Sequence, residues 1–255
     1  RNDVDLFDFT STKKYLDKIG PDIVINAAAK VGGILANSKQ PTEFLLENLK
    51  IQNNLIEGSW RNKVKRLLFL GSSCIYPKYA TQPIQEESLL TGPLESTNEW
   101  YAIAKIAGIK LCQALKKQHG FNSICLMPTN LYGPGDNYHS LNSHVIPGMI
   151  KKFYEGKENN SEFVTCWGSG TPLREFLYVD DLAEACIFVM EKWHFSNQKE
   201  FLDYEQKPIY WLNVGSSFEL SIKELANKIS KAIDFRGKIL WNKDMPDGTP
   251  RKKLD

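Results

Sequence analysis

Three short apolar runs alternate with two longer segments of helical spacing in the first half of the sequence. The runs are residues 22–26, 64–71 and 123–127, and apolar residues recur every three or four positions at 42–60 and 100–118. Continuous apolar runs of this length are typical of strands that are buried on both faces of a parallel sheet. The alternation therefore predicts βαβ units, an α/β fold with a Rossmann-type doubly wound parallel sheet, and ligands at the carboxyl ends of the strands.

The second half of the sequence continues this pattern with longer polar connections between the elements. We expect strands at 162–167, 209–214 and 238–241, and helices from about Pro147 to Phe153, from a cap at Asp180 or Asp181 to about Trp193, and at 221–233. Residues 195–208 are expected to form an excursion from the fold.

Charge and cysteine usage limit the class of protein. The 255 residues carry 32 Lys and Arg against 30 Asp and Glu, a net charge of +2, without the basic block that nucleic-acid-binding arms carry. Five cysteines without Cys-x-x-Cys spacing indicate reduced thiols. The residues contain no apolar run of membrane-spanning length and no signal-peptide pattern. We therefore expect a cytoplasmic protein that binds neither nucleic acid nor membrane.

The two ends of the sequence indicate that it is part of a longer protein. It begins at Arg1 without a methionine and stops at Asp255 in mid-pattern. We expect a fragment that lacks the first βα unit of its sheet.

A Tyr-x-x-x-Lys pattern, Tyr101 and Lys105, lies in the helix expected at 100–118. Residues four apart share a helix face, so the Lys105 ammonium would lie beside the phenol. It would lower the phenol pKa from about 10 and let Tyr101 exchange a proton with a carbonyl or alcohol oxygen. The pattern is common by chance, and its plain alternative is a solvated helix face.

Several motifs, in order along the chain, resemble the extended short-chain dehydrogenase/reductase family. They are Gly-Ser-Ser-Cys at 71–74, the Tyr101 and Lys105 pair, Pro-Thr-Asn-Leu-Tyr-Gly-Pro at 128–134 and Arg-Glu-Phe at 174–176. Further segments resemble its GDP-L-fucose synthase branch: Ala-Ala-Ala-Lys-Val-Gly-Gly at 27–33, Ser-Cys-Ile-Tyr-Pro at 73–77, Asn-Ser-His-Val-Ile-Pro at 142–147, Trp-Gly-Ser-Gly-Thr-Pro at 167–172 and Pro-Asp-Gly-Thr-Pro-Arg at 246–251. So many ordered motifs are more specific than any one of them.

The resemblance implies an enzyme that inverts C3 and C5 of GDP-4-keto-6-deoxy-D-mannose and reduces its C4 ketone with NADPH, giving GDP-L-fucose. Tyr101 would donate the proton to the C4 oxygen, and Lys105 would lower the phenol pKa and hold ribose hydroxyls. Ser72 would orient the ketone through a hydrogen bond. Cys74 and His144 would form the acid/base pair that inversion requires. The resemblance implies no metal.

Each of these roles has a plainer alternative. Ser72 is also typical of a turn or cap, Cys74 of a buried structural thiol, and His144 of a hydrogen-bonded core histidine. The other four cysteines lie in apolar helix or strand patterns and are expected in the core: Cys112, Cys125, Cys166 and Cys186.

The resemblance also implies the residues around each ligand. The NADP(H) cofactor would contact Arg1, Ala28, Ala29, Lys30, Lys105, Pro128, Thr129, Asn130, Leu131 and His144. The substrate would contact Ser73, Cys74, Asn130, Lys152, Trp167, Arg174 and Lys252, and the last four would face the guanosine diphosphate. Each of these four is alternatively a plain surface residue.

The same resemblance implies how the chain is divided into domains. Residues 1–134 would form an NADP-binding Rossmann-type domain. Residues 135–255 would mainly bind the nucleotide sugar, with segments around 174–190 and 209–216 returning to the first domain. A homodimer would form through the helices that follow residues 42 and 100.

Two departures from the family pattern leave rival functions open. The Gly-x-x-Gly-x-x-Gly loop that receives the cofactor pyrophosphate is absent from these residues, and Trp100 stands where the family usually has proline. One rival is another nucleotide-sugar epimerase or reductase of the same family, although a simple 4-epimerase would not need Cys74 and His144. The other is a fragment that binds nucleotide sugar without catalysis.

Overall fold

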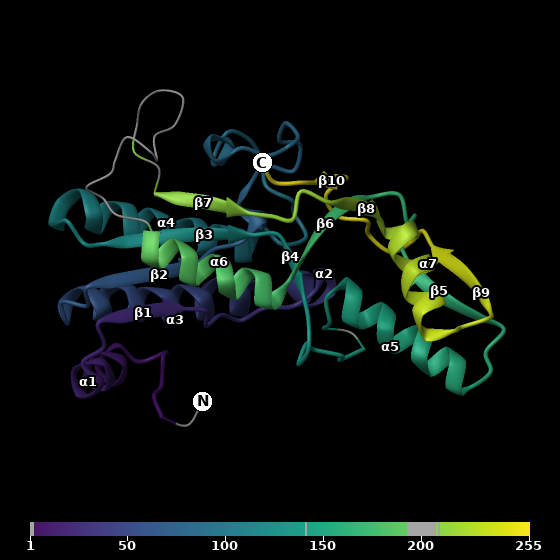
Figure 1. Ribbon diagram of the computed structural model, residues 1–255, viewed down its shortest axis with the longest axis horizontal. Coiled ribbons are helices and arrows are strands. Elements are labelled where there is room, and N and C mark those ends of the chain that lie inside the picture. Colours follow the sequence, from purple (N-terminus) through teal and green to yellow (C-terminus); the bar gives the residue numbers. More distant parts are fainter. Residues whose placement is uncertain (1–2, 141, 193–207, 209) are drawn as a thin grey trace.

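The computed structural model describes residues 3–140, 142–192, 208 and 210–255, and its centre is a parallel sheet (Figure 1). Four strands lie in the order β1-β2-β3-β7, and each pair is parallel. Their bounds are Ile23–Asn26, Arg66–Leu70, Ser123–Pro128 and Trp211–Val214. The Rossmann-type parallel sheet expected from the alternating pattern is confirmed. The expected excursion at 195–208 lies outside the described residues, apart from residue 208.

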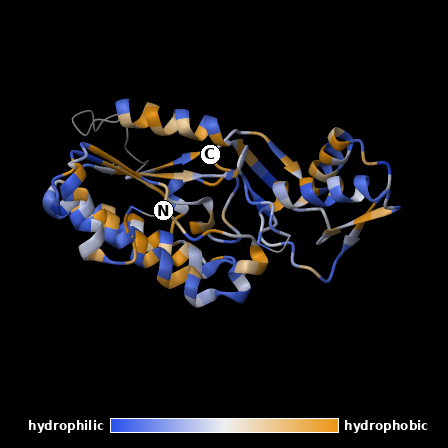
Figure 2. Cartoon of the chain, turned by 90° about the horizontal axis from the view of Figure 1, so that it is seen from below, coloured by the Kyte–Doolittle hydropathy of each residue, from blue (hydrophilic) through white to orange (hydrophobic). Residues whose placement is uncertain are grey.

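Helices cover both faces of this sheet (Figure 2). On one face lie α1 (Phe9–Ile19), α3 (Pro41–Arg61) and α4 (Glu99–His119), and on the other lies α6 (Val179–Lys192). Side chains alternate along a strand, so Leu67 and Phe69 of β2 pack toward α4 while Leu68 packs toward α6. All three are fully buried, and burying each side chain contributes about 1.5–3 kcal/mol to folding.

Helix α4 packs unusually close to the sheet. A Cβ atom on Gly108 would lie 2.6 Å from the Phe69 ring, so only glycine allows this approach. The helix ends at Gly120, whose φ of 68° is in the left-handed region that glycine adopts without strain. This packing fixes the height of α4 above the sheet, and therefore the position of the side chains near its amino end.

The second half of the chain forms smaller sheets beside the first (Figure 1). Strand β6 (Leu173–Tyr178) lies between β4 (Asn130–Tyr132) and β10 (Arg251–Lys252), and β8 (Glu219–Ser221) is antiparallel to it. Strands β5 (Phe163–Trp167) and β9 (Lys238–Asn242) form a separate parallel pair. Helices α5 (Val145–Glu158) and α7 (Ile222–Ile233) enclose a core with β5 around Phe153. The short helix α2 (Ile34–Lys39) precedes α3.

The expected strands and helices at 22–26, 42–60, 64–71, 100–118, 123–127, 162–167, 209–214, 221–233 and 238–241 are present within a few residues. One prediction is wrong: neither Asp180 nor Asp181 caps α6. Strand β6 runs directly into the helix at Val179, so both carboxylates lie inside the first turn, where the helix dipole favours negative charge. Sequence patterns did not indicate α1, β6 or β10.

The two halves meet at the carboxyl ends of β1, β2 and β3. The chain returns there at its end, because β10 pairs with β6 and Leu254 bridges to Ile84. In the described part of the chain, no helix is long and apolar enough to cross a membrane.

Candidate active site

A cavity of about 610 Å³ opens where the two halves meet, a volume typical of small-molecule sites. Its walls come from the carboxyl ends of three parallel strands, represented by Ala27, Gly71 and Pro128, from the start of α4, and from β6 and β10. Ligands bind at this edge of open parallel sheets, in the crevice outside the carboxyl ends of the strands. The cavity is therefore where the sequence predicted a ligand.

Ser72, Tyr101 and Lys105 lie together in this cavity. Ser72 caps a 3-10 turn at Ser73–Ile75 and accepts a 3.2 Å hydrogen bond from the Cys74 backbone amide. The Ser72 side chain also lies near enough to the Tyr101 phenol to lower its pKa. Lys105 lies one turn beyond Tyr101, is only 3% exposed, and donates a 2.8 Å hydrogen bond to the Leu70 carbonyl.

The expected effect of Lys105 on Tyr101 is corrected by the structure. Burial, followed by the neighbouring Cys74, raises the pKa of Tyr101 well above its usual value, and the Ser72 side chain only partly opposes this. The Lys105 ammonium lies over the ring, 5.7 Å from its centroid, and its hydrogen bond goes to the Leu70 carbonyl. Burial also lowers the pKa of Lys105 to about 8. The phenol is therefore protonated at neutral pH, as a proton donor must be.

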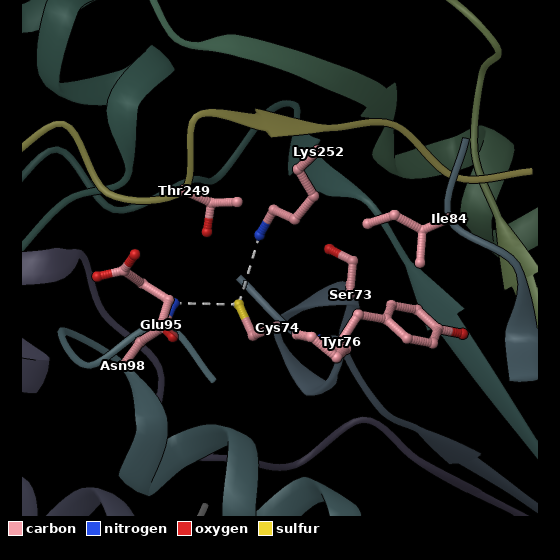
Figure 3. A pocket seen from close by; sticks show the side chains of 9 residues that line it. Ser73, Cys74, Tyr76, Ile84, Glu95, Asn98, Thr249 and Lys252 are labelled. Carbon is pink, nitrogen blue, oxygen red and sulfur yellow. Dashed lines mark hydrogen bonds between the residues drawn. The ribbon is translucent and has the colours of Figure 1, made fainter. Parts of the chain in front are cut away.

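Cys74 differs from the other four cysteines. Those four are buried, although Cys166 also lines the cavity, whereas Cys74 is half-buried. Its Sγ accepts a 3.4 Å hydrogen bond from Asn98 Nδ2 and a 3.5 Å hydrogen bond from Lys252 Nζ (Figure 3). A thiolate accepts such bonds far better than a neutral thiol. Cys74 therefore has the surroundings of a reactive cysteine.

His144 lines the same cavity at the start of α5, where it holds the N-cap position without a side-chain cap bond. The surrounding protein lowers the pKa of His144 through burial, the Asp136 carboxylate opposes this, and the Lys252 ammonium adds to it. The imidazole is therefore free of helix capping and sits between an acidic and a basic neighbour.

Most of the other predicted residues line the cavity, and a few do not. The lining includes Ala29, Ser73, Pro128, Thr129, Asn130, Leu131, Lys152, Trp167 and Arg174. Ala28 and Lys30 are not part of it. The Lys30 ammonium forms a 3.2 Å ion pair with Glu47. Arg1 lies outside the described residues.

The predicted guanosine-diphosphate residues are held by neighbouring groups. Lys152 Nζ lies 4.9 Å from the centroid of the Trp167 ring and donates to the Thr165 carbonyl at 3.1 Å. Arg174 donates to the Asp247 carbonyl at 3.1 Å, and burial lowers its pKa. Both cations keep further N–H groups that can reach a ligand in the cavity.

Sequence reasoning missed Asn98 and Thr97, which also line the cavity. Asn98 stands at the N-cap of α4, yet its side chain makes no cap hydrogen bond and turns to Cys74 instead. Its Oδ1 and the Thr97 hydroxyl are buried without a partner in the described protein. The sequence carried one signal, because Asn98 precedes Tyr101 by three residues and so lies near it at the helix start.

The cavity also fits a dinucleotide cofactor. An ammonium group can donate three hydrogen bonds. Among the described residues, Lys105 Nζ donates only one, to the Leu70 carbonyl. The remaining N–H groups are buried beside Tyr101, where a ribose diol can accept them. Asn26 Nδ2, at the end of β1, is also buried without an acceptor in the described protein.

Comparison with known proteins places the chain among nucleotide-sugar enzymes. Residues 1–202 match the NAD dependent epimerase/dehydratase family. The chain is 52% identical over 254 residues to putative GDP-L-fucose synthase 2 of Arabidopsis thaliana, covering 100% of this chain and 74% of that protein.

Solved structures agree with this similarity. A GDP-6-OMe-4-keto-L-xylo-heptose reductase from C. jejuni superposes with a TM-score of 0.93 at 32% identity, over 100% of this chain and 80% of that one. A GDP-L-fucose synthetase from Naegleria fowleri bound to NADP gives a TM-score of 0.83 at 30% identity, over 99% of this chain and 74% of that one.

Proposed function

This chain belongs to the NAD dependent epimerase/dehydratase family and, within it, to the GDP-L-fucose synthases, and on that premise we propose how its cavity works. The substrate is GDP-4-keto-6-deoxy-D-mannose, which is epimerised at C3 and C5 and reduced at C4 with NADPH. One observation supports this function most: a reductive group (Ser72, Tyr101) and an epimerising group (Cys74, His144) line the same cavity.

In the reductive half, Ser72 and Tyr101 hold the C4 oxygen. NADPH, when bound, supplies the hydride that C4 receives. Tyr101 donates its phenol proton to the C4 oxygen, and its raised pKa keeps that proton in place until then. The Ser72 hydroxyl, which lines the cavity beside the phenol, orients the carbonyl. The free N–H groups of Lys105 hold the ribose hydroxyls of the cofactor.

In the epimerising half, Cys74 acts as base and His144 as acid. The Cys74 thiolate takes the proton from C3 or C5, and the electron pair of that C–H bond moves into an enolate whose charge rests on the C4 oxygen. Ser72 and Tyr101 stabilise that charge through hydrogen bonds. His144 then returns a proton to the opposite face of the same carbon, which inverts it. One proton leaves and one arrives, so the ketone is regenerated for reduction.

We propose the following division of the chain. The sheet of β1, β2, β3 and β7, with its helices, binds NADP(H), and residues 135–255 mainly bind the nucleotide sugar. In support, β7 pairs with β3, and α6 packs on the sheet through Leu182 and Cys186, so the segments at 174–190 and 209–216 return to the first unit.

We propose a homodimer that forms through α3 and α4. These helices expose three large apolar side chains, Leu46 at 47%, Trp100 at 38% and Ile103 at 41%. Trp100 and Ile103 share one face of α4, since they lie three residues apart. Sedimentation velocity should give a dimer, and Ile103→Glu should shift it to a monomer. A monomeric wild-type protein would remove this part of the proposal.

We propose a cytoplasmic location on the evidence of the thiols. All five cysteines are free in the described structure, although burial and the neighbouring Cys112 raise the pKa of Cys125. Such thiols persist in a reducing compartment.

Product identification tests the whole function. The protein is incubated with GDP-4-keto-6-deoxy-D-mannose and NADPH in deuterium oxide, and the products are resolved by NMR. We expect GDP-L-fucose with deuterium at C3 and C5. A product reduced at C4 that keeps the D-manno configuration at C3 and C5 would instead favour a simple reductase. Fluorescence titration with NADPH separates both from a binding module, for which no cofactor binding is expected.

A further inference from the structure

The ammonium of Lys252 lies beside the Cys74 sulfur. Lys252 is in β10, is 8% exposed, and its Nζ is 3.5 Å from Cys74 Sγ (Figure 3). The two residues are 178 positions apart in the sequence. The resemblance implies that Lys252 faces the guanosine diphosphate, and in the protein without ligands its ammonium lies beside the thiol.

A buried ammonium needs a negative partner, because removing a charge from water is costly unless it is paired. Among the described residues, no carboxylate forms an ion pair with Lys252. Glu95 lines the same pocket, but its carboxylate is paired with Lys78 at 2.8 Å. Asp247, which lines the larger cavity, accepts two hydrogen bonds from Ser169. The group that can carry the compensating charge beside Lys252 is therefore the Cys74 sulfur.

A second donor points at the same atom. Asn98 Nδ2 lies 3.4 Å from Cys74 Sγ, so the sulfur accepts two hydrogen bonds. A neutral thiol is a weak acceptor, whereas a thiolate is a strong one. The two N–H donors beside the Cys74 sulfur therefore form the surroundings that stabilise an anion.

The strand that carries Lys252 is held firmly. The Leu254 amide donates to the buried Glu175 carboxylate at 2.9 Å, and the Lys253 amide donates to the Gln82 side chain at 2.9 Å. Lys252 itself pairs with Arg174 across the β10 and β6 strands. These bonds hold the backbone that carries Lys252, and the ammonium lies beside Cys74 in the protein alone.

We propose that Lys252 is a positioning residue of the epimerase half, whose ammonium, with the Asn98 amide, keeps Cys74 as the thiolate that removes the C3 and C5 protons. The inference rests on the proposed function and deepens it. Lys252 neither gains nor loses a proton in this step; the thiolate gains one from carbon, and the C–H electron pair passes into the enolate.

The same ion pair links the two halves of the site. Negative charge at Cys74 is, after burial, the next contribution that raises the pKa of Tyr101. Charge at Cys74 also acts on Arg174, which faces the same cavity. A thiolate at Cys74 therefore helps to keep the phenol protonated for the later reduction.

The proposal differs from a diphosphate-binding role in what happens without substrate. A lysine that only binds phosphate leaves the free thiol unchanged, whereas a lysine that stabilises the thiolate makes the free thiol reactive. Alkylation of the ligand-free protein by iodoacetamide measures this directly, because thiolate is the reacting form. Peptide mass spectrometry assigns the rate to Cys74, and the three buried cysteines that do not line the cavity, Cys112, Cys125 and Cys186, serve as internal references.

The variants are Lys252→Met, Lys252→Arg and, as a matched control on the neighbouring residue, Lys253→Met. At about pH 7 we expect Lys252→Met to slow alkylation of Cys74 by about tenfold or more, and Lys252→Arg to restore most of the rate. Lys253→Met should stay within about twofold of the wild type, since screening weakens a charge that does not touch the thiol. Circular dichroism checks that each variant is folded. A folded Lys252→Met protein that is alkylated as fast as the wild type would overturn the proposal.

A second measurement separates this proposal from the proposed function. Solvent-deuterium exchange at C3 and C5 should fall in Lys252→Met at about pH 7 and recover in part in Lys252→Arg, which restores a positive charge beside the sulfur. A rise in KM alone, with exchange at saturation unchanged, would favour phosphate binding and overturn the proposal. If the wild type shows no exchange while Lys252→Met still loses thiol reactivity, the ion pair stands and the proposed reaction fails.

Discussion

Lys105 Nζ lies 5.7 Å from the centre of the Tyr101 ring and donates to the Leu70 carbonyl at 2.8 Å. The Tyr-x-x-x-Lys motif suggests that Lys105 activates the Tyr101 phenol, but in the folded protein the two side chains have separate roles. Tyr101 keeps its proton because it is buried, and Lys105 offers its remaining N–H groups to a ligand.

Cofactor use should depend on the charge of Lys105. Burial lowers the pKa of Lys105 to about 8, so the group is an ammonium below that pH and a neutral amine above it. We expect kcat/KM for NADPH to be highest below about pH 8 and to fall above it, since kcat/KM reports groups of the free enzyme. Lys105→Met should lower kcat/KM and abolish this pH dependence. A profile for the variant that still falls near pH 8 would assign the dependence to another group.

Removal of the Tyr101 hydroxyl should separate the two halves of the reaction. In Tyr101→Phe the C4 oxygen loses its proton donor, so we expect reduction to fall by about 100-fold or more, a typical contribution of general acid catalysis. Exchange at C3 and C5 should continue at a lower rate, because Ser72 still bonds the oxygen. Oxidation of NADPH and deuterium content are measured in the same sample. Normal reduction by the variant would contradict the proton-donor role.

Replacement of the Cys74 sulfur should have the opposite effect. A serine hydroxyl is far less acidic than a thiol, so Cys74→Ser should suppress deuterium incorporation at C3 and C5 while NADPH binds with nearly unchanged affinity. Cys186→Ser is the control, because Cys186 lies on the buried face of α6, packs in the core and does not line the cavity. Equal exchange in Cys74→Ser and the wild type would remove Cys74 from the mechanism.

The buried carboxylate of Glu175 should matter for stability. Glu175 is 0% exposed and accepts hydrogen bonds from the Ser217 and Leu254 amides at 2.6 and 2.9 Å. In Glu175→Gln the side chain presents an NH2 group to one of these donors, so we expect the free energy of unfolding to fall by about 1–3 kcal/mol.

Urea denaturation measures this change, and the exposed Glu162, as Glu162→Gln, serves as the control. We expect Glu162→Gln to change the free energy of unfolding by less than about 0.5 kcal/mol. Equal stability of the two variants would show that the Glu175 hydrogen bonds make no net contribution.

The sequence by itself determined most of the elements around the parallel sheet and their order, although not α1. Apolar runs at 22–26, 64–71 and 123–127 record burial on both faces of a strand, and this local signal was enough for the parallel sheet and for the helices that follow residues 42 and 100. The ordered motifs around Ser72 and Tyr101 likewise indicated the reaction, because these residues lie at the end of a strand and on a helix that the periodicity already places.

Only the tertiary structure decided which polar side chains contact one another. Lys30 forms an ion pair with Glu47, and the Asn98 side chain bonds the Cys74 thiol and not its own helix. Lys252 contacts Cys74 although the two are 178 positions apart in the sequence. The direction of the Tyr101 pKa shift was also decided there, because burial raises the phenol pKa and the Ser72 side chain only partly opposes it. Periodicity reports how one element is buried, whereas distances and desolvation between elements depend on how all of them pack.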